Sequence, residues 1–255
     1  MGQPYLVYDR LAEWWPLLSP VERYQLSARW IGRIITNHKR IRGRTVLGLG
    51  MGGGCLAHLL KRRFRLTVSD ISPAMLEVSQ KFNPDCPHVC GDFRSMRLGA
   101  EFVAVIAEDA ISYATTVEEL SSVITTAYEH CLEGGGAVFI PEFTAETFVG
   151  DTYAGGANTR DAGLRYMRWT YLLEPPDPGY ESIFVYLTKQ KDAIEVLHER
   201  HRFGLFPRET WLSLMREVGF EPELAPFDDG RPDMVQRDAF VGVKVQAVTD
   251  ARSDT

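Results

Sequence analysis

The sequence predicts a doubly wound α/β domain built on a mostly parallel sheet of seven strands. Short apolar segments alternate with helical patterns between residues 44 and 140. These segments are apolar throughout, which is typical of strands that helices cover on both faces. A glycine-rich turn, GLGMGGG, lies between the first apolar segment and the helix that follows it. Together these features predict a Rossmann-like core that binds a ligand at one edge of its sheet.

Length, composition and charge limit the class of protein. The 255 residues, of which 45% are hydrophobic and 24% charged, fit one folded domain with a small lid. The net charge of −6 disfavours a nucleic-acid partner. The start of the chain lacks the pattern of a signal peptide, and no apolar run is long enough to span a bilayer. We therefore expect a cytoplasmic protein that does not bind membranes.

The four cysteines show no spacing typical of a disulfide framework. Cys86, His88 and Cys90 would share one face of a strand, but no fourth ligand lies nearby in the sequence. We expect buried thiols here and no metal site.

Residues 1–43 are predicted to form an N-terminal helical lid. Ser19 and Glu22 have the spacing of a capping box, and Pro20 fits the first turn of a helix. Apolar residues then recur at helical spacing through Ile35. The aromatic residues of this segment either cover a ligand or pack on the sheet.

Residues 44–150 are predicted to form the cofactor-binding core. Strands are expected at 44–50, 65–69, 87–90, 102–107 and 137–140. Helices are expected at 54–63, from Ser72 onward, and at 116–132. Ser72 is an N-cap followed by proline, Thr116 and Glu119 have capping-box spacing, and Gly134 fits a left-handed helix stop.

Residues 151–206 break this alternation and are predicted to form an antiparallel β insertion after the fifth strand. Segments rich in aromatic and β-branched residues predict strands at 165–173, 182–188 and 193–206, with a Pro/Gly-rich turn at 174–180. The insertion is expected to form a wall of the substrate pocket or the contact of a homodimer.

Residues 207–248 are expected to complete the core. The pattern predicts a helix at 207–218, which Gly219 ends, and strands at 222–227 and 239–245. The tail after Thr249 is expected to fray.

The glycine-rich turn and two later acids indicate an adenosyl ligand. Gly50 and the glycines after it allow close approach of the backbone to a ligand at a helix N-terminus. Asp70 follows Gly50 by twenty residues, where an acid can accept hydrogen bonds from both ribose hydroxyls. Asp92 follows the third strand and could accept from an adenine amine. Cys55 stands where a dinucleotide fingerprint has Gly or Ala, so a nicotinamide cofactor is the less favoured alternative.

The chain resembles the class I S-adenosylmethionine-dependent methyltransferases over roughly residues 5 to 246. VLGLGMGGG resembles the first motif of that family, LTVSDISPAML the second, and VCGDF the third. FVAVIAEDAISY and CLEGGGAVFIPEF resemble the regions around its fourth and fifth strands. YDRLAEWW and HRFGLFPRETW are most similar to bacterial small-molecule enzymes near the aminosugar N-methyltransferases. The resemblance implies methyl transfer to an N or O nucleophile of a natural product or sugar-like metabolite.

The resemblance also implies which residues hold S-adenosylmethionine. Glycines of the first motif would approach its methionine part, Asp70 its ribose, and the other residues its adenine or its methionine end. The positions that match are Gly50, Gly52, Gly54, Asp70, Ile71, Met75, Asp92, Phe93 and Glu108. The chain has Gly48 where the family usually has an acid, two residues before the first glycine. This departure leaves open a second hypothesis, a protein of this fold that binds the cofactor without methylating.

Four side chains are candidates for accepting a proton or positioning the methyl acceptor. Glu108 and Asp109 end the fourth strand, at the edge where open α/β sheets bind ligands. Glu142 follows the fifth strand and could instead cap the backbone, and His201 could instead be a hydrogen-bonded structural histidine. Aromatic and basic residues of the lid, the core and the insertion are candidates for contacting the small-molecule substrate: Tyr8, Trp15, Tyr24, Tyr113, Arg165, Trp169 and Arg202.

Overall fold

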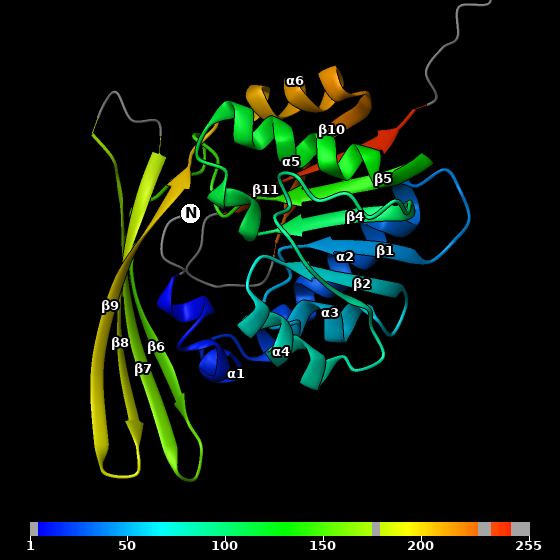
Figure 1. Ribbon diagram of the computed structural model, residues 1–255. Helices are drawn as coiled ribbons and strands as arrows, with labels where there is room; N and C mark the ends of the chain where they lie inside the picture. The colour runs from blue at the N-terminus through cyan, green and yellow to red at the C-terminus, as the bar shows by residue number, and fades with distance from the viewer. Residues whose placement is uncertain (1–4, 175–178, 229–235, 246–255) are drawn as a thin grey trace, which may run out of the picture.

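The computed structural model describes residues 5–174, 179–228 and 236–245, and these residues are organised by two separate sheets (Figure 1). The larger sheet has the strand order β10-β11-β5-β4-β1-β2-β3. Its strands are β1 (Thr45–Leu49), β2 (Arg65–Asp70), β3 (His88–Cys90), β4 (Phe102–Glu108), β5 (Cys131–Ile140), β10 (Phe220–Phe227) and β11 (Arg237–Lys244). Strands β1 to β5 run parallel, whereas β11 is antiparallel to both β5 and β10. The predicted doubly wound, mostly parallel seven-stranded sheet is confirmed.

Helices cover both faces of this sheet. Successive strand residues point to opposite sides, and on both sides they are apolar. Val46 of β1 packs with residues of α2 (Gln25–His38), α3 (Cys55–Leu60) and α4 (Pro73–Phe82). Leu47 packs on the other face with residues of α5 (Val117–Glu129) and α6 (Arg208–Val218). Each fully buried aliphatic side chain contributes about 1.5–3 kcal/mol. These two cores hold the carboxyl ends of the parallel strands in place.

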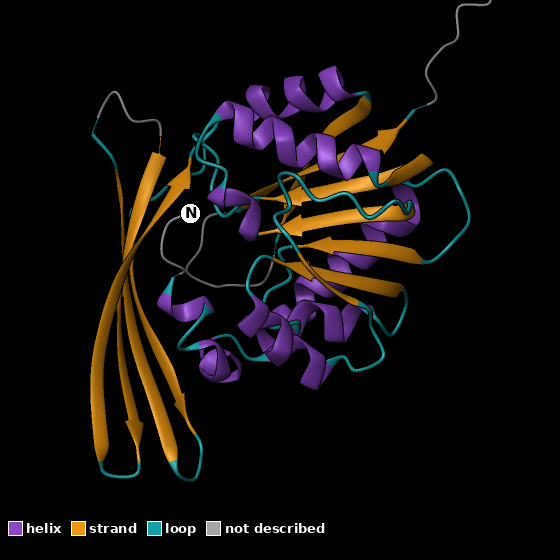
Figure 2. Cartoon of the chain, viewed as in Figure 1, coloured by secondary structure: helices purple, strands orange, loops and turns teal. Residues whose placement is uncertain are grey.

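The smaller sheet has the order β6-β7-β8-β9, is antiparallel throughout and stands beside the core (Figure 2). Its strands are β6 (Thr152–Asn158), β7 (Ala162–Leu172), β8 (Gly179–Gln190) and β9 (Ala193–Gly204). The expected antiparallel insertion is confirmed, but β6 was not predicted because its sequence, TYAGGAN, has glycines in place of a β-branched pattern. Residues 175–178 of the predicted turn and the tail after Thr249 lie outside the described residues.

The N-terminal segment lies between the core and the smaller sheet. It consists of short helical turns, η1 (Leu6–Tyr8), η2 (Ala12–Trp14), α1 (Trp15–Leu18) and η3 (Val21–Tyr24), before α2 begins. Val7 packs against Tyr186 of β8, and Ala12 packs against Met75 of α4. This N-terminal segment, called the lid below, therefore packs against both the smaller sheet and a helix of the core.

Two local predictions about helix ends were wrong. Ser19 does not cap a helix; its hydroxyl lies 2.8 Å from the hydroxyl of Tyr24, and residues 21–24 form a 3-10 turn ahead of α2. Helix α5 ends at Glu129 rather than near Leu132, because β5 already begins at Cys131. Gly134 has a φ of +72° within that strand and does not end the helix.

Other predicted caps are present. The Ser72 hydroxyl accepts the N–H of Met75 at 3.1 Å, and the Thr116 hydroxyl accepts the N–H of Glu119 at 3.2 Å. The Glu119 carboxylate accepts from the N–H of Thr115 instead of Thr116, which tightens the turn before α5. Gly219 ends α6 with a φ of +111°.

The cysteines are free, and three of them are buried, but Cys90 is exposed because it ends the edge strand β3. The His88 ring contacts the Ser79 hydroxyl at 2.8 Å and the carbonyl of Cys86 at 2.8 Å. Within the described ranges, no three His, Cys, Asp or Glu side chains are grouped so that they could hold a metal ion. No helix among those residues is both long and apolar enough to cross a membrane.

Candidate active site

The glycine-rich turn after β1 forms a close-packed bend that leaves no room for side chains. Gly54 has a φ of +75° at the N-terminus of α3, and a Cβ there would collide with the Ser79 hydroxyl. A Cβ on Gly50 would lie 2.5 Å from the Cβ of Ala110 and 3.8 Å from the ring of Phe93. The bend therefore brings bare backbone to the carboxyl edge of the sheet, next to Phe93.

Asp70, the last residue of β2, is bound to this bend. One carboxylate oxygen accepts the N–H of Gly52 at 2.7 Å, and the other accepts the N–H of Ser72 at 2.9 Å. Burial raises the pKa of the Asp70 carboxyl, although these backbone N–H groups oppose the shift. Each carboxylate oxygen keeps a second lone pair, so Asp70 can still accept from ligand hydroxyls.

Asp92 lies near Asp70, because the N–H of Gly91 donates to the carbonyl of Asp70 at 3.0 Å. Its carboxylate is paired with the guanidinium of Arg94, with contacts from 2.7 to 3.1 Å. Burial opposes ionisation of Asp92, but Arg94 lowers the pKa of this carboxyl overall. The two predicted acids are thus neighbours, and the second is already partly neutralised.

The two apolar residues expected beside the adenine have different environments. Ile71 is 58% exposed at the end of β2, where it can contact a ligand. Met75 is fully buried against Ala12 and Val78. Its Cε also lies against the glycine-rich bend, 3.2 Å from where a Cβ on Gly52 would be.

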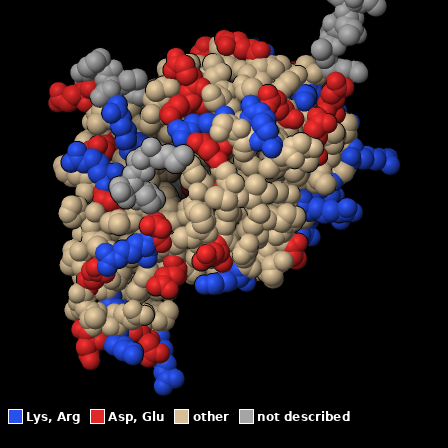
Figure 3. Space-filling model, viewed as in Figure 1, with Lys and Arg blue, Asp and Glu red and all other residues tan. Residues whose placement is uncertain are grey.

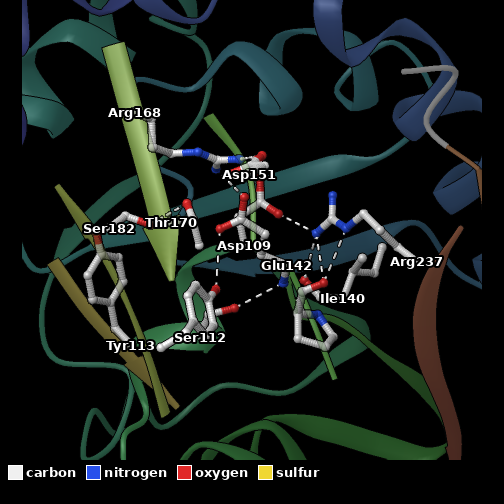
Figure 4. Close-up of polar contacts among 12 residues, drawn as sticks. Asp109, Ser112, Tyr113, Ile140, Glu142, Asp151, Arg168, Thr170, Ser182 and Arg237 are labelled. Carbon is white, nitrogen blue, oxygen red and sulfur yellow. Dashed lines mark hydrogen bonds and ion pairs between the residues drawn. The ribbon is translucent and has the colours of Figure 1, made fainter. Parts of the chain in front are cut away.

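Two acids end strand β4. Glu108 is 8% exposed, and Asp109 adopts a φ of +52°, a region that non-glycine residues rarely occupy. The Asp109 carboxylate pairs with the buried guanidinium of Arg237, which also donates to the carbonyls of Ile140 and Pro141 (Figure 4). Such strain costs about 1–3 kcal/mol and is typical of functional sites.

Glu142 follows β5 and belongs to a partly buried cluster of charged side chains. Arg168 of β7 reaches the Glu142 carboxylate and also the Asp151 carboxylate, the latter at 2.6 Å (Figure 4). Tyr180 donates to Glu142 at 3.3 Å, and the N–H of Glu142 donates to the Ser112 hydroxyl at 3.0 Å. This cluster joins the smaller sheet to the carboxyl end of β5.

A chain of hydrogen bonds links the lid, the core and the smaller sheet. The Tyr8 hydroxyl lies 2.9 Å from the Tyr113 hydroxyl, and Tyr113 lies 2.5 Å from His201 Nδ1. Tyr113 belongs to η4 (Ala110–Tyr113), the turn after β4, whereas His201 belongs to β9 and is buried. On the other side of the ring, His201 Nε2 lies 3.1 Å from Glu199, without the alignment of a hydrogen bond. Burial raises the pKa of both tyrosines, so their hydroxyls stay protonated.

Two further lid aromatics have different environments. The Trp15 ring lies directly against the backbone of Gly53, so it covers the glycine-rich bend. Tyr24 is hydrogen-bonded to Ser19 and packs on the core beneath α2, so its contacts are those of a structural residue.

Three residues predicted to contact substrate do not face this site. Arg165 and Trp169 lie on the exposed face of β7, and Arg202 is exposed on β9. Side chains alternate along a strand, and the sequence does not say which set faces the core. The inward set of β7 contains Arg168, which we did not predict. Glu199 was also not predicted. It lies two residues before His201 on the same strand, so the alternation of side chains would have placed it on the same face.

Comparisons with known proteins identify the family of this chain. Residues 46–135 match a family model described as a methyltransferase domain. The chain is 31% identical over 210 residues to the dTDP-3-amino-3,4,6-trideoxy-α-D-glucopyranose N,N-dimethyltransferase of Streptomyces venezuelae, covering 80% of this chain and 86% of that protein. It is 25% identical to the dTDP-3-amino-3,6-dideoxy-α-D-glucopyranose N,N-dimethyltransferase of Streptomyces fradiae, covering 80% of each.

Among solved structures, a sugar N-methyltransferase of a Streptoalloteichus species has a similar fold. The TM-score is 0.77, with 24% identity over 88% of each chain. This likeness concerns the fold, which is that of the Rossmann-like methyltransferases. The chain belongs to the class I S-adenosylmethionine-dependent methyltransferases. Neither the nicotinamide alternative nor the non-methylating alternative is favoured by these relatives, which are named as methyltransferases.

Proposed function

We propose that this enzyme transfers a methyl group from S-adenosylmethionine to the amine of an aminosugar carried on a nucleotide. The observation that carries the proposal is the position of Tyr113. Its hydroxyl contacts Tyr8 of the lid and His201 of the smaller sheet, beside the strand end where the glycine bend also lies. A small polar acceptor enclosed by three parts of the chain fits such a site. The relatives described above, which are named for dTDP-linked aminosugars, support the substrate class.

The residues of the bend fit the adenosyl group of the cofactor. We assign Gly50, Gly52 and Gly54 to its methionine part because they form the bend of bare backbone at the carboxyl edge of the sheet, where a Cβ at Gly50 or Gly54 would collide with neighbouring side chains and displace the bend. Asp70 would accept from the ribose hydroxyls, and Ile71 would pack on the adenine. The bound cofactor supplies a methyl group on a positively charged sulfur.

The rim of the same site completes the assignment. Phe93, beside Gly50, would also contact the adenine, and Asp92 would share its carboxylate between the adenine amine and Arg94. Glu108 would lie close to the methionine end. Met75 would support the adenine pocket from beneath the lid rather than contact the ring.

The chain's own residues then have to align the amine and receive its proton. Asp109 and Glu142 are both paired with arginines, which keeps their carboxylates ionised, so they would accept hydrogen bonds from the N–H groups of the sugar amine rather than take its proton. The Tyr8 and Tyr113 hydroxyls stay protonated, so they relay a proton rather than keep it. His201 Nδ1, at the end of this chain of hydroxyls, is our candidate for the final acceptor.

A paired-substrate assay tests the proposal. The wild-type enzyme would be given methyl-labelled cofactor with a dTDP-linked 3-amino-deoxysugar, or with the same sugar bearing a hydroxyl in place of the amine. We expect label in the amino compound only. Label in the hydroxyl compound alone would show O-methylation, and no transfer to either compound despite tight cofactor binding would contradict the proposal.

Partners and domain roles follow from the same proposal. We assign residues 1–43 to a lid, 44–150 and 207–248 to the cofactor-binding core, and 151–206 to the substrate wall. Acidic and basic side chains are interspersed on the face seen in Figure 3, and this supports a small-molecule acceptor over a nucleic acid. Homodimer formation through the smaller sheet stays a prediction. Sedimentation equilibrium would test it.

A further inference from the structure

We propose that Glu199 is a positioning residue that couples closure of the lid to alignment of the His201–Tyr113 chain. The inference rests on the proposed function and extends it to a residue that contacts neither cofactor nor acceptor. Glu199 lies on β9, two residues before His201, so both side chains point to the same face of the smaller sheet. Its side chain is only 8% exposed.

One carboxylate holds the start of the lid. Oε2 of Glu199 accepts the N–H of Leu6 at 2.5 Å, and Oε1 accepts the N–H of Val7 at 3.0 Å. These are the first two residues of the turn η1, whose N–H groups have no partner within the turn. Hydrogen bonds from backbone N–H groups to an ionised carboxylate are among the strong ones. Glu199 therefore fixes the lid by its backbone, whatever the lid side chains are.

The same carboxylate faces the buried histidine. Oε1 also accepts the Tyr186 hydroxyl at 3.0 Å and lies 3.1 Å from His201 Nε2. Burial alone would raise the pKa of Glu199, but His201 and the two lid N–H groups lower it overall. A carboxylate beside Nε2 favours a proton on that nitrogen, which leaves Nδ1 free to accept from Tyr113. Glu199 thereby sets the direction in which the tyrosine hydroxyls donate.

Lid closure and histidine alignment are coupled because the lid packs on the same ring. Tyr5 stacks on His201 with centroids 3.9 Å apart and an interplanar angle of 16°. Tyr8, one residue after Val7, supplies the first hydroxyl of the chain. When the lid leaves Glu199, it also withdraws Tyr5 and Tyr8 from His201. The proton acceptor is thus assembled only under a closed lid.

The test compares Glu199→Gln with Glu195→Gln. Glu195 lies on the same strand and also binds the lid, through an exposed ion pair with Arg10 at 2.5 Å. Each variant thus removes one negative charge from β9 and weakens the contact of that residue with the lid. Only Glu199→Gln changes the side chain beside His201. Hydrogen exchange at Leu6 and Val7 reports the lid without any acceptor, and kcat and KM report turnover.

For Glu199→Gln we expect faster exchange at both amides and a kcat lower by on the order of 100-fold, with a much smaller change in the acceptor's KM. For Glu195→Gln we expect both measures to stay within about threefold of the wild-type enzyme. Equal behaviour of the two variants would overturn the proposal. Faster exchange in Glu199→Gln with an unchanged kcat would also overturn the proposal, because His201 would then be aligned without Glu199.

A second variant decides the outcome if Glu199→Gln does not fold. Leu6→Pro removes one N–H that Glu199 accepts, and the extended backbone of Tyr5, with ψ of 138°, is compatible with a following proline. Faster exchange at Val7 and a reduced kcat are expected, and unchanged values would overturn the proposal. If the wild-type enzyme methylates no amine, the proposed function is wrong. The exchange measurements need no acceptor, so they still test the contact between Glu199 and the lid.

Discussion

The N–H of Gly52 donates a 2.7 Å hydrogen bond to the carboxylate of Asp70, so the glycine bend after β1 and the acid that ends β2 form one unit. The second carboxylate oxygen holds Ser72 at the start of α4. A ligand that binds Asp70 therefore meets a bend whose backbone is already fixed. This unit belongs to the part of the site that the sequence predicted.

Replacing Asp70 should weaken cofactor binding. Asp70→Asn removes the charge and leaves one oxygen for two backbone donors, and hydrogen bonds to charged groups contribute about 1.5–3 kcal/mol each. We expect the affinity for S-adenosylhomocysteine, measured by calorimetry, to fall about 10- to 100-fold. Asp85→Asn is the control, because Asp85 pairs with Lys61 on the surface. An equal loss of affinity in both variants would contradict the assignment.

The pH dependence of cofactor binding should report the same carboxyl. Burial raises the pKa of Asp70, and the ribose contact requires the ionised form. Affinity should therefore begin to fall, as pH is lowered, at a higher pH than for an ordinary aspartate. For folding the sign is opposite: a raised pKa means that the folded state binds the proton more tightly, so this contribution to stability is lost as pH rises through that pKa. A titration of S-adenosylhomocysteine affinity against pH checks this, and the step should vanish in Asp70→Asn.

Alanine substitutions at two glycines with positive φ distinguish the cost of backbone strain from the cost of a steric collision. Gly54 has a φ of +75° and a Cβ there would collide with Ser79, whereas Gly99 has a φ of +62° with open space around it. Gly99→Ala should cost about 1–2 kcal/mol through strain alone. Gly54→Ala should cost more and should also weaken cofactor binding, because the bend must shift. Urea denaturation measures both, and similar losses would mean that Ser79 moves aside easily.

Two arginines on β7 test which face of the smaller sheet meets the core. Arg168 is partly buried between the carboxylates of Glu142 and Asp151, whereas Arg165 is exposed on the opposite face. Arg168→Met should lower the free energy of unfolding by about 1–3 kcal/mol, because it leaves two partly buried carboxylates without a cation. Arg165→Met should change it by no more than about 0.5 kcal/mol. Comparable effects in chemical denaturation would contradict the assigned faces.

The sequence alone determined the parts of this protein that depend on local chemistry. The segment after residue 44 consists of a strand, a glycine turn and a helix, and Asp70 follows Gly50 by twenty residues. Such a segment has few alternative structures, because backbone conformation and short-range caps fix it. The Ser72 cap and the Gly219 stop were predicted for the same reason. The strand β6 was missed because its stability comes from pairing with β7 rather than from its own residues.

Only the tertiary structure decided which distant residues meet. Arg237 approaches Asp109 across 128 positions of the sequence, and Glu199 approaches Leu6 across 193. No local pattern encodes such contacts, because they depend on strand order and on which face of each strand is buried. If the opposite face of β7 is taken as the inward one, Arg165 and Trp169 replace Arg168, and this outward set is the one that we predicted. The proposed cofactor half of the site is therefore local in origin, whereas the proposed acceptor half depends on the N-terminal segment, the turn after β4 and β9 coming together.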